Sequence, residues 1–205
     1  MAKVHPQLLT SSTSSKQEEF TLWMKSLIMG SNGCAVFDSN GRIVYRVDNY
    51  SHKCTNRVCI MDVTGKVLFT IVKKKFSLFA TWKGYRSTTE TYCSSKEKEK
   101  PAFRVRKLMG IRMILGFLRG YSFCKVVIKL DEDIICEYEM ENQSSKQSCR
   151  IVDTFGGLVA EVKRKITTNG VVLGEDVLTM VVEPHIDHSL IMGLVVVFGL
   201  MHHKL

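Results

Sequence analysis

Apolar and polar positions alternate along much of the chain, and short polar turns interrupt the alternation. Three of these turns have the form Asp-x-x-Gly and lie between apolar runs, at positions 38–41, 62–65 and 153–156. Aspartate at the first position can accept a hydrogen bond from the backbone N–H two residues further on, and glycine at the last position adopts the left-handed conformation of a type I turn followed by a bulge. The repeated pattern therefore predicts three β-hairpins.

Other apolar stretches have the length and composition of strands, with Val, Ile, Phe and Tyr enriched. We expect an edge strand within Phe20–Leu27 and further strands at Phe76–Trp82, Phe103–Leu108, Tyr121–Leu130, Ile134–Met140, Val159–Ile166 and Val171–Val182. The turns at Asp131–Asp133 and Thr168–Gly170 predict two more hairpins. Residues 87–100 have the composition of a polar surface loop, and the apolar, glycine-containing residues 109–120 are compatible with either strand or loop.

The C-terminal stretch Leu190–Met201 contains no polar residue. Two structures fit it: a membrane tail anchor, or a helix buried on all sides within the protein. Spanning a bilayer takes about 20 apolar residues, and this run has 12, which favours the buried helix. Extending the run towards its N-terminus would bring Asp187 and His188 into lipid, where both are unfavourable. We therefore predict a buried helix over about residues 186–201. Pro184 suits a first helical turn, where its missing N–H costs nothing.

Together, the patterns predict ten to a dozen short strands followed by one apolar helix. The fold class is therefore mainly β: a closed antiparallel barrel of about twelve strands around a buried C-terminal hydrophobic helix. A barrel of this size is too wide for its own side chains to fill, so the helix is the expected filler. Residues 1–18, which are polar and rich in Ser and Thr, predict a disordered tail, and residues 19–205 predict a single domain.

The formal net charge of +9 favours acidic partners such as nucleic acid, an anionic membrane surface or an acidic protein. The chain has seven cysteines, an odd number, and no Cys-x-x-Cys pair. Its N-terminus lacks the apolar core of a signal peptide. These features predict a reducing, cytoplasmic environment with free and mostly buried thiols.

Several motifs in the chain combine into a recognisable set. They are Val36–Gly41 with Val44–Tyr50, Met61–Lys66 with Leu68, Ile71–Leu78 with Trp82, Gly174–Pro184, and Met192–Leu194 in the apolar helix. This combination resembles the plant LURP-one-related family over nearly the whole chain after residue 20. The resemblance implies a tubby-C-terminal-like fold, a twelve-stranded barrel around a central hydrophobic helix. It also implies kinship with phospholipid scramblases and tubby-like membrane-tethered transcription factors, and a link to plant defence.

The resemblance brings no site residues with it. The calcium ligands of a scramblase would form an acidic loop of EF-hand type, and Asp131–Asp133 is too short for one. No motif places the phosphoinositide-binding residues of tubby proteins on this chain. Because a fold does not define an activity, the candidate site has to come from the residues themselves.

Signatures of catalysis are missing from the sequence. It has no Gly-x-Ser-x-Gly, no phosphate-binding glycine loop and no His-Glu-x-x-His, so we expect a non-enzymatic protein without a cofactor. The pairs His185/His188 and His202/His203 lie near the two ends of the predicted helix, and metal binding is one interpretation of them. Capping, a dipole interaction or simple exposure is more common at helix ends, and we expect no metal site.

Basic residues are the best candidates for a site. They form three clusters in or beside predicted strands: Lys73, Lys74 and Lys75; Arg104, Arg106 and Lys107; and Lys163, Arg164 and Lys165. If these clusters converge, they can hold the anionic headgroup of a phospholipid, with about 1 kcal/mol from each basic residue near the surface. The alternative is that they are solvated outer positions of barrel strands, where polar residues are needed in any case.

We therefore expect a monomeric binding protein that tethers to phosphoinositide or another anionic phospholipid at a membrane, in the cytoplasm or the nucleus. An unknown protein partner is the alternative ligand. Direct nucleic-acid binding is not expected, because aromatic residues do not interleave with the charges. Two further alternatives stay open: scramblase-like lipid handling with the helix in a bilayer, and a protein-interaction module with no lipid ligand.

Overall fold

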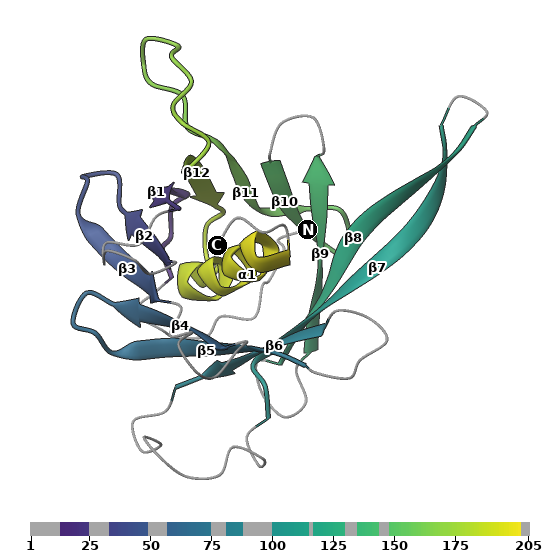
Figure 1. Ribbon diagram of the computed structural model, residues 1–205, viewed down its shortest axis with the longest axis horizontal. Coiled ribbons are helices and arrows are strands. Elements are labelled where there is room, and N and C mark those ends of the chain that lie inside the picture. Colours follow the sequence, from purple (N-terminus) through teal and green to yellow (C-terminus); the bar gives the residue numbers. More distant parts are fainter. Residues whose placement is uncertain are drawn as a thin grey trace.

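The computed structural model describes residues 13–24, 33–48, 57–74, 81–87, 100–114, 117–129, 135–143 and 148–201, with the backbone alone for 109–114, 117–122 and 143. Within these residues, twelve strands form a closed barrel around one helix, α1 (Figure 1). Strands that follow one another in sequence are antiparallel neighbours, and β1 also pairs with β12, which closes the ring. The predicted fold class is confirmed.

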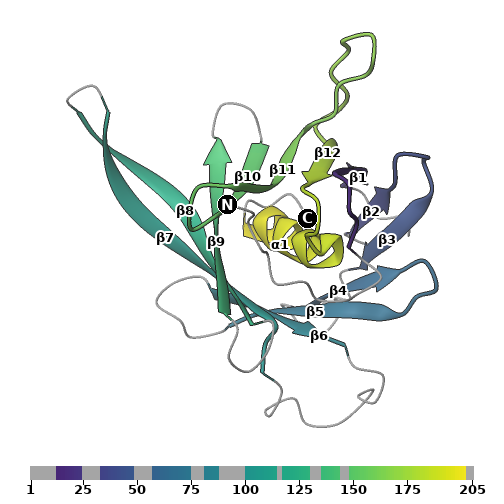
Figure 2. The same ribbon diagram turned by 180° about the vertical axis from the view of Figure 1, so that it is seen from behind.

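Short strands make up most of the ring, while β7 has 12 residues and β8 has 13. This long pair projects from the barrel (Figure 2). The elements are, in chain order, β1 (Glu18–Trp23), β2 (Gly33–Phe37), β3 (Ile43–Asp48), β4 (Arg57–Asp62), β5 (Val67–Lys73), β6 (Thr81–Arg86), β7 (Phe103–Ile114), β8 (Phe117–Lys129), β9 (Ile135–Gln143), β10 (Ser148–Asp153), β11 (Leu158–Arg164), β12 (Val177–Val182) and α1 (His188–Met201).

The three Asp-x-x-Gly turns fold as predicted. In the first, Oδ1 of Asp38 accepts a hydrogen bond of 2.8 Å from the backbone N–H of Arg42, and Gly41 has a φ of 75°. The turns at 62–65 and 153–156 repeat these features, and the strand register shifts beside each of the three turns. Because the same residue types produce the same turn and bulge each time, the hairpins β2–β3, β4–β5 and β10–β11 are confirmed.

Helix α1 lies inside the ring of strands, with its residues from Ser189 to Gly199 buried (Figures 1 and 2). In the part of the chain that the structure describes, no helix has both the length and the apolarity needed to span a bilayer. Because its residues from Ser189 to Gly199 are buried within the ring, the helix fills the barrel, as predicted. Buried apolar side chains from the strands surround it, including those of Leu22, Val36, Ile60, Phe69, Val105, Val126, Met140, Ile151 and Met180.

A close contact between the helix and the wall is centred on Phe103 of β7, which is fully buried. A Cβ atom on Gly193 of α1 would lie 3.0 Å from the Phe103 ring, and one on Gly84 of β6 would lie only 2.1 Å from it. The ring centroid of Phe69 is 5.8 Å from that of Phe103. The two glycines thus leave the space in which the Phe103 ring packs between wall and helix.

Asp187 caps the N-terminus of α1. Its Oδ1 accepts a hydrogen bond of 2.9 Å from the backbone N–H of Ser189, and its Oδ2 lies 2.8 Å from a guanidinium nitrogen of Arg86. A carboxylate suits this position because it satisfies an unpaired helix N–H group and lies at the positive end of the helix dipole. Since the cap is Asp187, the helix begins at His188 rather than at about 186. Pro184 precedes the helix instead of lying in its first turn.

Several strands differ from their predicted bounds. β1 is not an edge strand, because closure of the barrel pairs it with both β12 and β2. The strand expected at Phe76–Trp82 is β6, which begins at Thr81, and residues 75–80 lie outside the described part of the chain. The ambiguous segment 109–120 is strand in β7 and β8, apart from 115–116, which are not described. β12 begins only at Val177, after a turn closed by a hydrogen bond from its N–H to the Gly174 carbonyl.

Residues 13–17, which the sequence assigns to the tail, run beside the segment that leads into α1. Thr13 forms a β-bridge with Asp187, and the backbone N–H of His185 donates a hydrogen bond of 2.7 Å to the carbonyl of Ser14. β1 then begins at Glu18. Of the residues that the prediction placed in the tail, Glu18 therefore belongs to the barrel, and backbone groups of Thr13 and Ser14 pair with the segment before α1. Residues 1–12 lie outside the described residues.

We expect Gly84→Ala to lower the free energy of unfolding by about 1–3 kcal/mol, the usual range for overpacking a filled core. The added methyl group would overlap the Phe103 ring, which is held on its other side by α1. Urea denaturation measures the change. In a Phe103→Leu background the same substitution should be better tolerated, because the ring is gone. An equal loss in both backgrounds would contradict the packing of Gly84 against Phe103.

Candidate functional site

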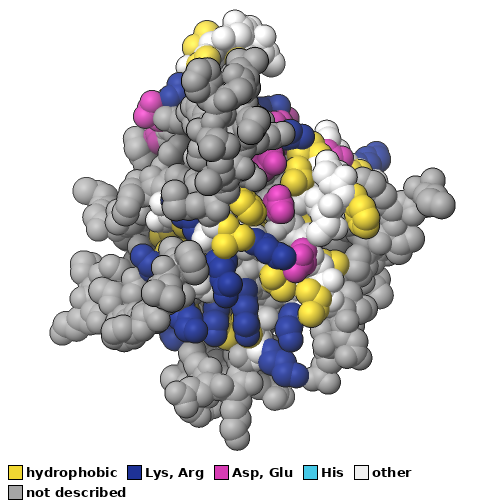
Figure 3. All heavy atoms as spheres, turned by 90° about the vertical axis from the view of Figure 1, so that its right-hand side faces the viewer, with side chains coloured by type: hydrophobic (Ala, Val, Ile, Leu, Met, Phe, Trp, Pro, Cys, Tyr) yellow, Lys and Arg dark blue, Asp and Glu magenta, His cyan; other side chains and the backbone are white. Residues whose placement is uncertain are grey.

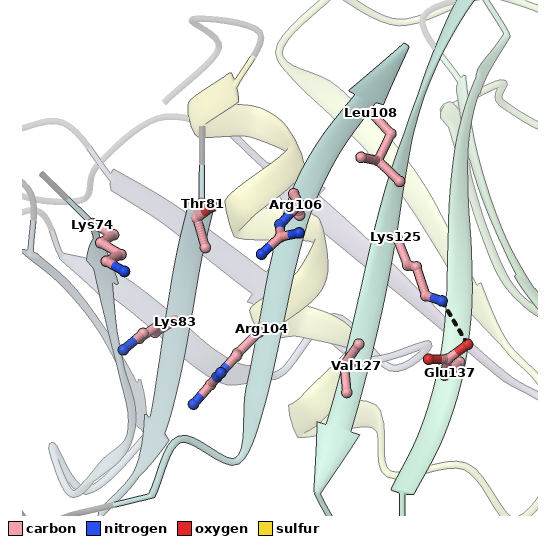
Figure 4. Close-up of a pocket in the computed structure, with 9 residues that line it drawn as sticks. All are labelled: Lys74, Thr81, Lys83, Arg104, Arg106, Leu108, Lys125, Val127 and Glu137. Carbon is pink, nitrogen blue, oxygen red and sulfur yellow. Dashed lines mark ion pairs between the residues drawn. The ribbon is translucent and has the colours of Figure 1, made fainter. Parts of the chain in front are cut away.

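A hollow of about 380 Å³ lies on the outer face of β6, β7 and β8 (Figures 3 and 4). Strand alternation produces it: Phe103 and Val105 of β7 are buried in the core, while Arg104 and Arg106 between them are exposed. Figure 3, which views the right-hand side of Figure 1, shows Lys and Arg side chains gathered on this face. The residues that line the hollow are Lys74, Thr81, Lys83, Arg104, Arg106, Leu108, Lys125, Val127 and Glu137.

The charge of the hollow is strongly unbalanced: the described lining residues include five cationic side chains and one carboxylate. That carboxylate, Glu137, already pairs with Lys125, with Oε2 2.8 Å from Nζ. No ion pair joins any of the other four lysines and arginines of the hollow to a carboxylate within the described residues. An anion entering the hollow would therefore meet four cations that form no ion pair with a carboxylate in the described part of the chain.

The strand register brings like charges directly opposite each other. Lys83 of β6 lies opposite Arg104 of β7, and Arg106 of β7 lies opposite Lys125 of β8. Opposed residues on one face of an antiparallel pair have Cβ atoms about 4.5–5.5 Å apart, and like charges at that separation destabilise the sheet. Glu137 offsets the charge of Lys125, so the repulsion that a bound anion would relieve lies mainly between Lys83, Arg104 and Arg106.

The structure brings together three of the predicted basic residues, Lys74, Arg104 and Arg106. It adds two that sequence reasoning missed, Lys83 and Lys125, which come from the flanking strands (Figure 4). Both are isolated basic residues within strands, so a search for clusters along the sequence does not find them. Only the strand register, which places each of them opposite an arginine of β7, identifies them as neighbours of the hollow.

Two residues of the first and second predicted clusters face away from the hollow. Lys73 pairs in register with Trp82, which is buried, and Nζ of Lys73 lies 5.6 Å from the centroid of the Trp82 ring. Lys107 lies opposite Cys124, which is also buried. Because consecutive strand residues alternate between faces, a run of adjacent basic residues cannot form one patch. Lys75 lies outside the described residues.

The third predicted cluster does not join the hollow. It lies on β11 and just after it, and β9 and β10 separate β11 from β8 in the ring. Each of its members also has an acidic neighbour: Lys163 lies 3.5 Å from Glu161, Arg164 lies 2.7 Å from Glu175, and Lys165 lies 3.9 Å from Glu19. These residues fit the alternative interpretation of solvated outer strand positions.

His188 of the first histidine pair is a core-facing residue. Its Nδ1 lies 2.6 Å from the hydroxyl oxygen of Tyr45, and its Nε2 lies 3.5 Å from Glu18. Burial lowers the pKa of His188, and the nearby carboxylates of Glu18 and Asp187 only partly offset this. No group of three potential metal ligands occurs among the described residues, which exclude His202 and His203.

Three of the five described cysteines have the environment of small core side chains. The five cysteines within the described residues form no disulfide, and Cys34, Cys124 and Cys149 are buried. Burial raises the pKa of Cys34 to about 12 and also raises the pKa of Cys124 and of Cys149. These three thiols therefore stay protonated at neutral pH, whereas a nucleophilic cysteine needs a lowered pKa.

Comparison with known proteins gives a consistent picture. The model of a family described as LURP-one-related matches residues 18–199. Similar proteins include Protein LURP-one-related 11 of Arabidopsis thaliana, 45% identical over 98% of this chain and 89% of that protein, and Protein LURP-one-related 4 of the same plant, 40% identical over 98% and 87%. An X-ray structure of an Arabidopsis thaliana protein aligns with a TM-score of 0.62 at 14% identity, covering 93% of this chain and 94% of the other. At that identity the likeness concerns the fold.

We expect the protein to lose stability as the pH falls below about 6.5, partly because of His188. In the unfolded chain this histidine takes up a proton near pH 6.5, whereas in the folded protein its lowered pKa delays protonation. Between pH 6.5 and the lowered pKa, the unfolded state thus binds more protons than the folded state. The free energy of unfolding therefore decreases as the pH decreases. Urea denaturation from pH 8 to pH 5 measures the slope.

His188→Gln should flatten this slope between pH 7 and the lowered pKa, because the titrating group is gone. The matched control is His185→Asn, which replaces the neighbouring exposed histidine, at a φ of 64° that asparagine also adopts. The control should keep the slope of the unmodified protein. An unchanged slope in His188→Gln would show that other groups cause the pH dependence.

Proposed function

The chain belongs to the LURP-one-related family, and we propose that it binds polyanionic membrane headgroups, such as those of phosphoinositides, through the basic hollow on β6–β8. The observation that carries this proposal is the strand register, which places Lys83 opposite Arg104 and Arg106 opposite Lys125. A volume of about 380 Å³ is within the range of small-ligand sites. The proposed role is binding without catalysis and without a cofactor.

The chemistry of the hollow favours a headgroup over nucleic acid. Among the described residues, its uncharged lining consists of Thr81, Leu108 and Val127, none of which is aromatic. Proteins that bind single strands use aromatic residues on which the bases stack. Lysine and arginine side chains, by contrast, are what phosphate groups require. An acidic segment of a protein partner remains the second class of ligand that the charge of the hollow would accept.

Membrane tethering follows from the same proposal. A monomeric barrel that holds headgroups on its outer surface would associate with the periphery of an anionic membrane from the cytoplasm and could release into the cytoplasm or nucleus. Scramblase-like lipid handling through α1 is disfavoured, because burial of the helix from Ser189 to Gly199 leaves it no free face for lipid. A role in plant defence signalling rests on the family resemblance alone.

Co-sedimentation with vesicles tests the proposal. We expect the protein to bind phosphatidylcholine vesicles that contain phosphatidylinositol 4,5-bisphosphate, and binding should weaken as salt rises, because salt screens exposed charges. Arg104→Glu/Arg106→Glu should reduce the affinity by about thirty-fold or more, since each lost cation contributes about 1 kcal/mol. Both residues are exposed, so the variant should fold, which its unfolding curve checks.

The matched control is Arg42→Glu/Lys66→Glu, which changes the net charge equally at two exposed turn positions. This control should bind like the unmodified protein. Equal binding to vesicles with and without the phosphoinositide would contradict the proposal, as would equal losses in both double variants.

A further inference from the structure

The β7–β8 hairpin continues well beyond the rest of the barrel (Figures 1 and 2). β7 pairs with β6 only from Phe103 to Arg106, and β8 pairs with β9 only from Phe123 onwards. Past these points, within the described residues, the two strands pair with each other alone. We call residues 109–114 and 117–122 the ribbon. It consists of two strands, and neither of its two edges pairs with another strand of the described chain.

The composition of the ribbon is unusual for such an extension. Between Leu108 and Phe123 the sequence has only two charged residues, Arg112 and Arg119, and they lie directly opposite each other. The pairs beyond them are apolar: Met113 opposite Leu118, and Ile114 opposite Phe117. A ribbon surrounded by water would normally carry polar residues on both faces, since it has no core to cover. This composition indicates a surface that a partner covers.

Strand alternation relates the ribbon to the basic hollow. Even-numbered positions of β7 share the outer face with Arg104 and Arg106, so Arg112 and Ile114 belong to that face. At about 3.3 Å per residue, Ile114 is about 26 Å along the strand from Arg106. The face that begins with the cations of the hollow thus continues to an arginine pair and ends with an apolar pair.

We propose that the ribbon enters the interfacial region of an anionic bilayer while the hollow holds a headgroup. This inference rests on the proposed function and names its partner as a lipid surface rather than a free phosphate. Apolar and aromatic residues such as Ile114 and Phe117 partition into that region, and Arg112 and Arg119 can keep their guanidinium groups at the level of the lipid phosphates.

The backbone limits how deep the ribbon goes. Both edges of the ribbon have N–H and C=O groups without a neighbouring strand among the described residues. In the hydrocarbon core such groups would be left without hydrogen bonds, at a cost of several kcal/mol each. The ribbon therefore stays within the outer 5–10 Å or so, the depth reached by interfacial amphipathic segments.

A second copy of the chain is the competing occupant, because free strand edges can pair between molecules. Charge favours the bilayer. An edge-to-edge dimer would bring two Arg112–Arg119 pairs together near two basic hollows, whereas an anionic surface neutralises all of them.

Vesicle binding and soluble-headgroup binding separate the two proposals. Ile114→Glu/Phe117→Glu should weaken binding to phosphatidylinositol 4,5-bisphosphate vesicles at least about ten-fold. Binding of soluble inositol 1,4,5-trisphosphate, measured by calorimetry, should stay unchanged. The matched control is Val63→Glu/Phe155→Glu, which replaces two exposed apolar residues in turns of other hairpins, 61% and 90% exposed. It should leave both affinities unchanged.

A reporter that preserves the apolar character gives independent evidence. Phe117→Trp should show a blue shift of its fluorescence with these vesicles, and quenching by lipids brominated near the headgroup end of the acyl chain. The unmodified protein, with Trp23 and Trp82, supplies the background. No blue shift and no quenching while the protein is bound to vesicles would overturn the inference.

The remaining outcomes are distinguishable. If the protein binds the trisphosphate and Ile114→Glu/Phe117→Glu does not change its affinity for vesicles, the ribbon inference is overturned and the hollow remains the binding site. Ribbon-dependent vesicle binding without any trisphosphate binding would support the ribbon and overturn the proposed function. A dimer in light scattering that Ile114→Glu/Phe117→Glu dissociates, without an effect on vesicle binding, would assign the ribbon to self-association and overturn the inference.

Discussion

Filling the interior of a twelve-stranded barrel is the constraint on which the rest of this structure depends. The inner faces of the strands cannot meet across so wide a ring, so α1 occupies the centre. Phe103 joins the two parts, since its ring packs against Gly193 of the helix and against Gly84 of the neighbouring strand. The buried side chains of the described strands are thereby part of one hydrophobic core around α1, and the basic hollow lies on the outer face.

The two-residue period of the strands connects this core to the basic hollow. In β7 the residues that pack on the helix, Phe103 and Val105, alternate with Arg104 and Arg106. The register then adds Lys83 and Lys125 from both sides. Like charges placed opposite each other disfavour the sheet, and for Lys83 and Arg104 no ion pair with a carboxylate of the described residues offsets this. A bound anion would offset it, and the projecting ribbon continues the same face.

The fold could be predicted because its signals lie in residues adjacent in sequence. The hollow could not, because it depends on which strand residues lie opposite each other. The Asp-x-x-Gly turns and the length of the apolar helix are readable from neighbouring residues, and both were confirmed. The hollow depends on register between strands that are separated in sequence, so Lys83 and Lys125 were missed. Of the described residues in the three basic clusters, only Lys74, Arg104 and Arg106 line the hollow, because neighbouring residues such as Arg106 and Lys107 of β7 lie on opposite faces of the strand. The start of α1 was misplaced because the cap is Asp187.

A methyl-resolved NMR titration with soluble inositol trisphosphate tests the central claim most directly, because it locates the ligand without altering the protein. Leu108 and Val127 line the hollow, and Val195 and Val196 are buried in α1. We predict saturable chemical-shift changes at the methyl groups of Leu108 and Val127 that weaken as salt is added, with none at Val195 or Val196. Shifts confined to methyl groups elsewhere on the barrel, or no shifts at all, would contradict headgroup binding in the hollow.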